Sequence, residues 1–393
     1  MAKANKEGQR KAPILRFKGF TDDWEQRQLG EVSQLNGRIG FRGYTAKDII
    51  SKESGGILTF SPTNIINNLL EVKGSNTYIT REKYEESPEI QVNNSDILFV
   101  KTGSTLGKSA LVSGLMEPAT INPQIVIIRS QRKWIQFLSV LLMTSCIQKQ
   151  ITAAKIGGAV PTLTESEIKK FKFYIPNDLN ETGKIGQFFS KIDSLIALYE
   201  RKIKALKKLK QAIFEVLNSI PHKSNVYRIS EIFDVTRGNV LSKKSISNKF
   251  SNMYPVYSSQ TKNDGLLGYY SDYLFENSIT WTTDGANAGT VKYRTGKFYC
   301  TNVCGVLLNS EGYCNEYTAE VIEKETPKFV SHVGNPKLMN NVMKQIKIKL
   351  PDVATQQSYS DILLTFDNVC TSFCNKLNDL NQIKNKLLNT MFI

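Results

Sequence analysis

The stretch "IGQFFSKIDSLIALYERKIKALKKLKQAIFEVL", residues 185–217, predicts one long amphipathic helix. Moving from Ile185 by alternating steps of four and three residues, nine of ten positions are apolar and only Lys210 is charged. At 1.5 Å per residue, such a helix is about 50 Å long. The predicted seam consists of Ile185, Phe189, Ile192, Ile196, Tyr199, Ile203, Leu206, Lys210, Ile213 and Leu217.

The same pattern returns 174 residues later, at the end of the chain. Nine of the ten shifted positions are apolar, and the tenth is again a lysine, Lys384. This agreement indicates an internal duplication. The second seam consists of Tyr359, Leu363, Phe366, Cys370, Phe373, Leu377, Leu380, Lys384, Leu387 and Met391.

The duplication extends upstream of both helices. In the first copy Thr164 and Glu167 form a capping-box pattern, which predicts a short helix before a strand that ends at Pro176. The matching pairs are "PTLTESEIKKFKFYIP" (161–176) with "PKLMNNVMKQIKIKLP" (336–351), "ILFVKTGSTLG" (97–107) with "ITWTTDGANAG" (279–289), and "GEVSQLNGR" (30–38) with "SEIFDVTRG" (230–238).

These repeats predict an α+β protein with two similar mixed α/β domains separated by two long helices. Antiparallel pairing buries both seams most directly and gives internal pseudo-two-fold symmetry; a parallel pair needs residues 221–358 to return the chain along the helix. The predicted segments are a flexible basic tail (1–16), a first recognition domain (17–180), a central spacer helix (181–220), a second recognition domain (221–355) and a C-terminal spacer helix (356–393).

The charge favours a polyanionic partner. A formal charge of +15 and a pI near 9.3 suit DNA, because clustered Lys and Arg release counterions from phosphates. Two non-identical domains held tens of Å apart also match half-sites that recur every ~34–36 Å. A bland basic surface, or a homodimeric coiled coil with solvated bases at 201–210, remains an alternative.

The glycine loop "KTGSTLGKS" (101–109) follows an apolar strand and resembles a phosphate-binding loop. It has three residues between its glycines where a Walker loop has four, and the second copy "TTDGANAGT" (282–290) has no lysine. Contact with DNA phosphates is the favoured function, with a plain tight turn as the alternative. The candidates are Lys101, Thr102, Ser104 and Lys108 in the first copy and Asn287 in the second.

Candidate base-reading residues lie on predicted loops of both domains. Arg suits guanine, while Asn and Gln suit adenine. They are Arg38, Arg42 and Lys47 in the first domain, and Arg237, Asn239, Lys243, Lys244, Ser258, Ser259, Gln260 and Asn263 in the second.

No catalytic constellation is apparent in the sequence. The two histidines, His222 and His332, are far apart, and neither an HExxH motif nor zinc-type cysteine spacing is present. We expect structural, reduced cysteines, no bound metal and, because no signal peptide or apolar span of ~20 residues is seen, a cytoplasmic protein.

With its order of domain, helix, domain, helix, the chain resembles the specificity subunit of type I restriction-modification enzymes. The resemblance rests on "ILRFKGFTDDWEQRQLGEV" (14–32), on "GGAVPTLTESEIKKFKFYIP" (157–176) and on the helix that follows, and it covers nearly the whole chain. The second copy has "HVGNPKLM" (332–339) in place of "GGAVPTLT" (157–164), so contacts made there by the first domain cannot be assumed in the second.

The resemblance implies two target-recognition domains that each read one half of a bipartite site in double-stranded DNA. It implies two methyltransferase subunits docked on the helices, and restriction subunits that complete an ATP-dependent nuclease. S-adenosylmethionine, ATP and Mg²⁺ then belong to the partners, and this chain is non-catalytic by itself. The alternatives are a free-standing sequence-specific DNA-binding regulator with a coiled-coil spacer, and a structural coiled-coil scaffold.

Overall fold

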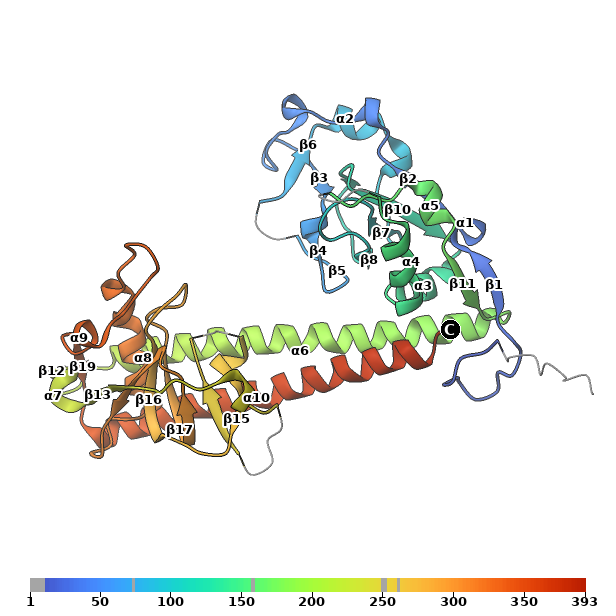
Figure 1. Ribbon diagram of the computed structural model, residues 1–393. Helices are drawn as coiled ribbons and strands as arrows, with labels where there is room; N and C mark the ends of the chain where they lie inside the picture. The colour runs from blue at the N-terminus through green and yellow to red at the C-terminus, as the bar shows by residue number, and fades with distance from the viewer. Residues whose placement is uncertain (1–10, 73–74, 157–159, 249–252, 260–261) are drawn as a thin grey trace, which may run out of the picture. The chain divides into compact units, whose positions relative to one another are not determined.

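The computed structural model describes residues 11–72, 75–156, 160–248, 253–259 and 262–393. Its chain forms two compact units: unit 1 contains residues 1–198 and 376–393, and unit 2 contains residues 199–375. Figure 1 shows the elements of each unit. Both units mix helices with largely antiparallel sheets, which confirms the predicted α+β class.

The elements of unit 1 are the strands β1 (Glu25–Gln28), β2 (Ser33–Gly37), β3 (Ile57–Phe60), β4 (Ile65–Ile66), β5 (Leu69–Leu70), β6 (Thr77–Ile79), β7 (Ile97–Val100), β8 (Ser109–Leu111), β9 (Ala119–Ile121), β10 (Ile125–Ser130) and β11 (Lys172–Ile175), with the helices α1 (Leu29–Val32), α2 (Arg81–Glu85), α3 (Arg132–Leu141), α4 (Ser145–Ala154) and α5 (Glu165–Lys169). Helix α6 (Leu179–Ser219) starts in unit 1 and ends in unit 2.

The elements of unit 2 are the strands β12 (Asn225–Arg228), β13 (Asp234–Arg237), β14 (Tyr254–Tyr257), β15 (Leu266–Tyr270), β16 (Phe275–Thr282), β17 (Val291–Cys300), β18 (Cys304–Leu308) and β19 (Lys347–Leu350), with the helices α7 (Ile229–Ile232), α8 (Glu316–Glu325) and α9 (Asn340–Met343). Helix α10 (Val353–Thr390) starts in unit 2 and ends in unit 1.

The two units repeat one topology. The sheet order β2-β10-β7-β8 of unit 1 matches β13-β18-β16-β17 of unit 2, and the separate pair β1-β11 matches β12-β19. A parallel pairing also recurs, between β3 and β9 in unit 1 and between β14 and the end of β17 in unit 2. The duplication found in the sequence is therefore a duplication of fold.

Strand β7 shows how the core of unit 1 forms. Its sequence "ILFV" is apolar throughout because both faces of the strand are buried. Ile97 and Phe99 join a cluster with helices α3, α4 and α6, whereas Leu98 and Val100 join a second cluster with β3 and β9. Alternate side chains of one strand thus join two apolar layers.

Local signals in the sequence set the short helices. The hydroxyl of Thr164 accepts from the Glu167 N–H at 3.2 Å, and the Glu167 carboxylate accepts from the Thr164 N–H at 2.7 Å. This reciprocal capping box starts α5 and confirms the prediction. The strands that follow α5 and α9, β11 and β19, bury alternate residues as their sequences predict.

The long helices pair antiparallel within each unit. In unit 1 the start of α6, with Ile185 and Phe189, packs in one cluster with Leu388 at the end of α10 and with Met391 directly after it. In unit 2 the end of α6, with Phe214 and Leu217, packs in one cluster with the start of α10. The opposed directions agree with the predicted pairing.

The seam residues lie on the paired faces of these helices. Tyr199 and Phe373 meet edge to face with ring centroids 5.5 Å apart in unit 2, and Leu377 and Leu380 pack against the apolar cluster of unit 1. Phe189, Ile192, Ile196, Leu363 and Cys370 are buried, and Tyr199, Ile203, Leu206, Phe366, Phe373, Leu377 and Leu380 are half-buried.

Candidate nucleic-acid interface

The two units hold the same glycine loop in the same hydrogen-bond frame. Each loop has two glycines with φ between +87° and +107°, a conformation that L side chains rarely adopt, so glycine is required there. The matched bonds, unit 1 first, are Gly103 N to Pro161 O (3.0 Å) with Gly285 N to Pro336 O (2.9 Å), Leu163 N to Lys101 O with Leu338 N to Thr283 O (both 2.9 Å), and Gly107 N to Val100 O with Gly289 N to Thr282 O (both 2.9 Å).

A groove of about 590 Å³ lies beside the glycine loop of unit 1, and hydroxyl groups dominate its polar lining. Ser104 and Lys108 line it and are exposed, and Thr102 lines it half-buried. Hydroxyls both donate and accept, so they can contact phosphate oxygens or base edges. The lining is Ser61, Pro62, Thr63, Ile65, Ile66, Thr102, Gly103, Ser104, Thr105, Lys108 and Gln124.

Lys101 differs from the other predicted loop residues. Its Nζ lies 3.1 Å from Glu165 Oε1 in an ion pair, and only 18% of its side chain is exposed. The loop lysine that is exposed at the groove is therefore Lys108.

The corresponding strand face of unit 2 is polar. Leu98 and Val100 of β7 are buried in an apolar cluster, but the residues at their places in β16 are Thr280 and Thr282. Both threonines line a pocket of about 180 Å³ together with Ser258, Asp264, Trp281, Thr290, Lys292, Arg294, Cys304 and Glu323. Equivalent strand positions therefore carry apolar side chains in unit 1 and hydroxyl side chains in unit 2.

Arg294 organises the pocket of unit 2. Its guanidinium lies 3.8 Å from the ring centroid of Tyr257 and donates to the carbonyl of Asp264 at 2.8 Å. Burial acts to lower the pKa of Lys292, but the carboxylates of Glu323 and Glu320 outweigh it, so that pKa is raised. Lys292 therefore stays charged in this pocket.

The three candidates of the 36–48 loop differ in exposure. Arg38 is 6% exposed and donates to Ile121 O at 3.1 Å and Thr120 Oγ1 at 3.0 Å. Burial lowers its pKa. Arg42 is half-buried and donates to the carbonyl of Glu86 at 3.2 Å, whereas Lys47 is exposed.

The candidates that follow β13 in unit 2 are mostly exposed. Asn239, Lys243 and Lys244 are exposed. Arg237 is half-buried, and its Nε donates to Asn340 Oδ1 at 2.8 Å. Asn287, on the glycine loop of unit 2, is half-buried.

The candidates between β14 and β15 form a less uniform group. Ser258 lines the pocket of unit 2, with its Oγ 2.9 Å from Thr301 Oγ1, and Ser259 is half-buried. Gln260 lies outside the described residues. The backbone of Asn263 forms part of the short 3-10 helix Lys262–Gly265.

Sequence reasoning missed three residues that the structure brings to these sites. Gln124 and Thr63 line the groove of unit 1, and Arg294 lines the pocket of unit 2. Gln124 follows Pro123 in the stretch "NPQI", a turn signal that could have drawn attention to it. Arg294 lies within a strand and gave no such signal.

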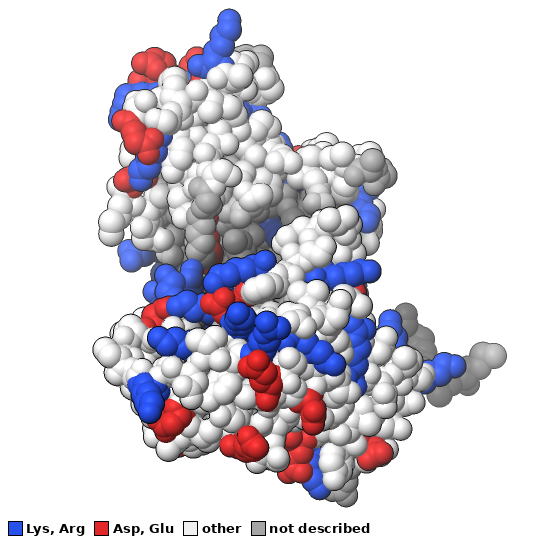
Figure 2. Space-filling view, turned by 90° about the vertical axis from the view of Figure 1, so that its left-hand side faces the viewer, with Lys and Arg blue, Asp and Glu red and all other residues white. Residues whose placement is uncertain are grey.

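Positive charge is concentrated on part of the surface. Figure 2 shows Lys and Arg side chains gathered in one band of the face in view. With a net charge of +15, such gathering favours polyanion binding.

Within residues 11–72, 75–156, 160–248, 253–259 and 262–393, no group of three or more His, Cys, Asp or Glu is placed to hold a metal ion. Across the same ranges, no helix has both the length and the apolar character to cross a membrane.

Comparison with known proteins identifies the family. The family model for the type I restriction modification DNA specificity domain matches residues 21–208 and again 221–385. These ranges cover most of the chain, and the chain belongs to this family.

Curated relatives and a solved structure agree with the family match. The N-terminus of a putative type I specificity subunit of Mycoplasma pneumoniae is 40% identical over 143 residues, 36% of this chain and 76% of the relative. The type I restriction enzyme MpnII specificity subunit of the same organism is 37% identical over 147 residues, 37% of this chain and 44% of the relative. The crystal structure of a type I restriction-modification S subunit from M. genitalium matches with a TM-score of 0.69 and 16% identity over 97% of this chain and 99% of that one, a likeness of fold.

Proposed function

We propose that this member of the type I restriction-modification DNA specificity family reads a bipartite site in double-stranded DNA, one half with each unit. One observation carries the proposal. The two units repeat a single loop frame, but the cavities beside it have different linings. A shared scaffold with divergent contact chemistry is what two half-site specificities require.

The groove of unit 1 supplies the groups that this function needs. Lys108 at its edge provides a cation for phosphate, while the hydroxyls and the amide of Gln124 provide donors and acceptors for phosphates or base edges. In unit 2 we assign the same role to the exposed Asn239, Lys243 and Lys244.

The chain acts without catalysis of its own. It positions two methyltransferase subunits and restriction subunits on the DNA, in the cytoplasm. S-adenosylmethionine, ATP and Mg²⁺ are bound by those partners. The long helices α6 and α10 support this role, because each begins in one unit and ends in the other.

The proposal is tested by co-expressing the tagged chain with a family methyltransferase subunit and selecting duplexes from a random library. We expect the two proteins to purify together and to select two short conserved blocks separated by a fixed number of arbitrary base pairs. A chain that selects a single continuous block without any partner is the free-standing regulator. A chain with no salt-dependent DNA affinity is a scaffold.

A further inference from the structure

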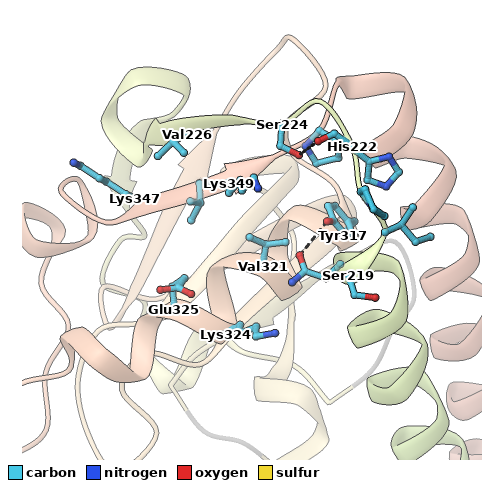
Figure 3. A pocket seen from close by; sticks show the side chains of 15 residues that line it. Ser219, His222, Ser224, Val226, Tyr317, Val321, Lys324, Glu325, Lys347 and Lys349 are labelled. Carbon is cyan, nitrogen blue, oxygen red and sulfur yellow. Dashed lines mark hydrogen bonds between the residues drawn. The ribbon is translucent and has the colours of Figure 1, made fainter.

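Unit 2 contains a large open pocket away from its glycine loop. It has a volume of about 620 Å³ and lies between the end of α6, the strand pair β12-β19 and helix α8 (Figure 3). Apolar surface is exposed there, because Val226 is 63% exposed and Ile220 is 40% exposed. Tyr317 and Val321 of α8 also line it.

The equivalent place in unit 1 is filled by the protein itself. Trp24 directly precedes β1, and Phe392 follows α10; their ring centroids lie 6.3 Å apart, and both are buried. Both also pack against Phe137 of α3. The segment that leads to Trp24 is held against α10 by the Leu15 N–H, which donates to the Thr390 carbonyl at 2.9 Å.

The duplication shows why the pocket of unit 2 is open. Strand β12 matches β1, so Ser224 stands where unit 1 has Trp24. The helix offset of 174 residues places Asn218 where unit 1 has Phe392. Ser224 and Asn218 both line the pocket. Two large rings are thus replaced by two small polar side chains, and residues 220–224 connect α6 to β12 too directly to supply a covering segment.

Two lysines beside the apolar surface indicate the charge of an occupant. Lys347 and Lys349 project from β19 and are exposed, and within the described part of the chain neither has an ion-pair partner. Lys324 and Glu325, which also line the pocket, are paired with Glu215 at 2.5 Å and Lys328 at 2.7 Å. The unpaired charge at this pocket is therefore positive.

The segment that covers unit 1 shows a chemistry that suits this pocket. It ends in Asp22-Asp23-Trp24, two acids followed by the buried ring. We propose that the pocket of unit 2 binds a segment of a partner protein that inserts an aromatic side chain between Ser224 and Asn218 and places adjacent carboxylates on Lys347 and Lys349. An aromatic anchor in a desolvated pocket with charged neighbours is typical of strong peptide contacts.

The test measures the binding of a dye-labelled synthetic peptide, with Asp-Asp-Trp at its centre, to the full chain by fluorescence anisotropy. We expect Lys347→Glu with Lys349→Glu to weaken binding about tenfold or more, and Ser224→Trp with Asn218→Phe to abolish it by filling the pocket. A peptide with Ala in place of Trp should bind no better than background. The matched control is Lys172→Glu, at the position of unit 1 that corresponds to Lys347, and it should leave binding unchanged.

Lys347 and Lys349 are exposed, so their substitution by Glu should not prevent folding. These variants test the proposal even if the chain with Ser224→Trp and Asn218→Phe does not fold. Equal peptide binding by the original chain and by the charge-reversed chain overturns the proposal. The proposal is also overturned if the peptide does not bind and the charge reversal instead weakens binding of a DNA duplex or of inorganic phosphate. The pocket is then a phosphate site. Loss of self-association in the charge variants, measured by sedimentation, with no peptide binding, identifies a second copy of the chain as the occupant instead.

Discussion

At the scale of single residues, one half-buried lysine links three elements of unit 2. Lys210 on α6 lies 2.6 Å from Glu316 and 2.8 Å from Glu320, both on α8, and 2.8 Å from Asp367 on α10. Three carboxylates surround the single ammonium group of Lys210, so this partly buried site carries excess negative charge. Burial raises the pKa of the Glu316 carboxyl to about 8, although the positive charge of Lys210 acts to lower it.

This pKa predicts how stability depends on pH. An acid that binds its proton more tightly in the folded state contributes stability that is full below its ordinary pKa near 4.5 and is lost as the pH rises through about 8. We expect unit 2 to lose stability between pH ~5 and ~8, and Glu316→Gln to flatten this decline. Urea unfolding followed by Trp281 fluorescence, in a Trp24→Phe and Trp134→Phe background, measures it.

The exposed Glu311→Gln serves as the control, and it should keep the decline of the original chain. An unchanged pH dependence in Glu316→Gln contradicts the assignment.

A second prediction concerns the groove of unit 1. If Lys108 contacts a phosphate, Lys108→Gln weakens DNA binding similarly for all sequences and reduces the slope of log affinity against log salt by about 1. Filter binding over a salt series measures both effects. Lys133→Gln, at an exposed position on α3, is the control, and a slope that falls equally in both variants argues against a specific contact.

The limits of sequence reasoning are clear from individual residues. Arg38 has the residue type and the predicted loop position of a base-contacting residue. Its guanidinium instead donates hydrogen bonds to Thr120 and Ile121, more than 80 residues away in the sequence. No local pattern reveals such a contact. The glycine loops were identifiable because φ near +100° restricts the residue type in both copies.

At the scale of elements, the two polar seam positions are equivalent. Lys384 on α10 pairs with Asp193 on α6 at 2.6 Å in unit 1, just as Lys210 pairs with Asp367 in unit 2. Adding 174 to 193 and 210 gives 367 and 384, so the duplication preserved both partners. A polar pair in an apolar seam disfavours misaligned helix pairing.

The charges of the Lys384–Asp193 pair can be exchanged by mutation. Lys384→Asp brings two carboxylates together and should destabilise unit 1, and the added change Asp193→Lys should restore part of the loss, with a coupling of about 1 to 3 kcal/mol. Urea unfolding of the four combinations, followed by the tryptophans of unit 1 in a Trp281→Phe background, gives the coupling. A double variant no more stable than Lys384→Asp rules out a direct pairing role.

The helices also predict a spacing effect. Inserting one heptad after Leu198 in α6 and another after Asn375 in α10 preserves the seam and adds about 10 Å of helix. At ~3.4 Å per base pair, the spacer of the recognised site should lengthen by about three base pairs. The site selected from a duplex library reports this length; an unaltered spacer shows that the helices do not set it.

The long helices were the most predictable elements, because steps of four and three residues repeat over ten positions. Their ends differ from expectation by only a few residues, with α6 at Leu179–Ser219 and α10 at Val353–Thr390. The sheets were predictable only in part. The pairing of β14 with β17 joins residues more than 40 positions apart, and neither strand alone indicates its partner.

At the scale of the whole molecule, the chain contains the same fold twice. Strand order, loop hydrogen bonds and seam charges recur, whereas the grooves and the covering of the first strand do not. The conserved parts explain how the chain folds and pairs its helices, and the divergent parts are where we place specificity. Sequence comparison of the copies could separate these two sets, but the chemistry of each cavity required coordinates.

The most direct test of this account is to replace residues 221–350 with the corresponding domain of another family member. The chimaera is co-expressed with the methyltransferase subunit, and the recognised site is determined by selection from a duplex library. We predict that one half of the site changes while the other half and the spacer are retained. A site in which both halves change, or in which neither does, contradicts the claim that each unit reads its own half.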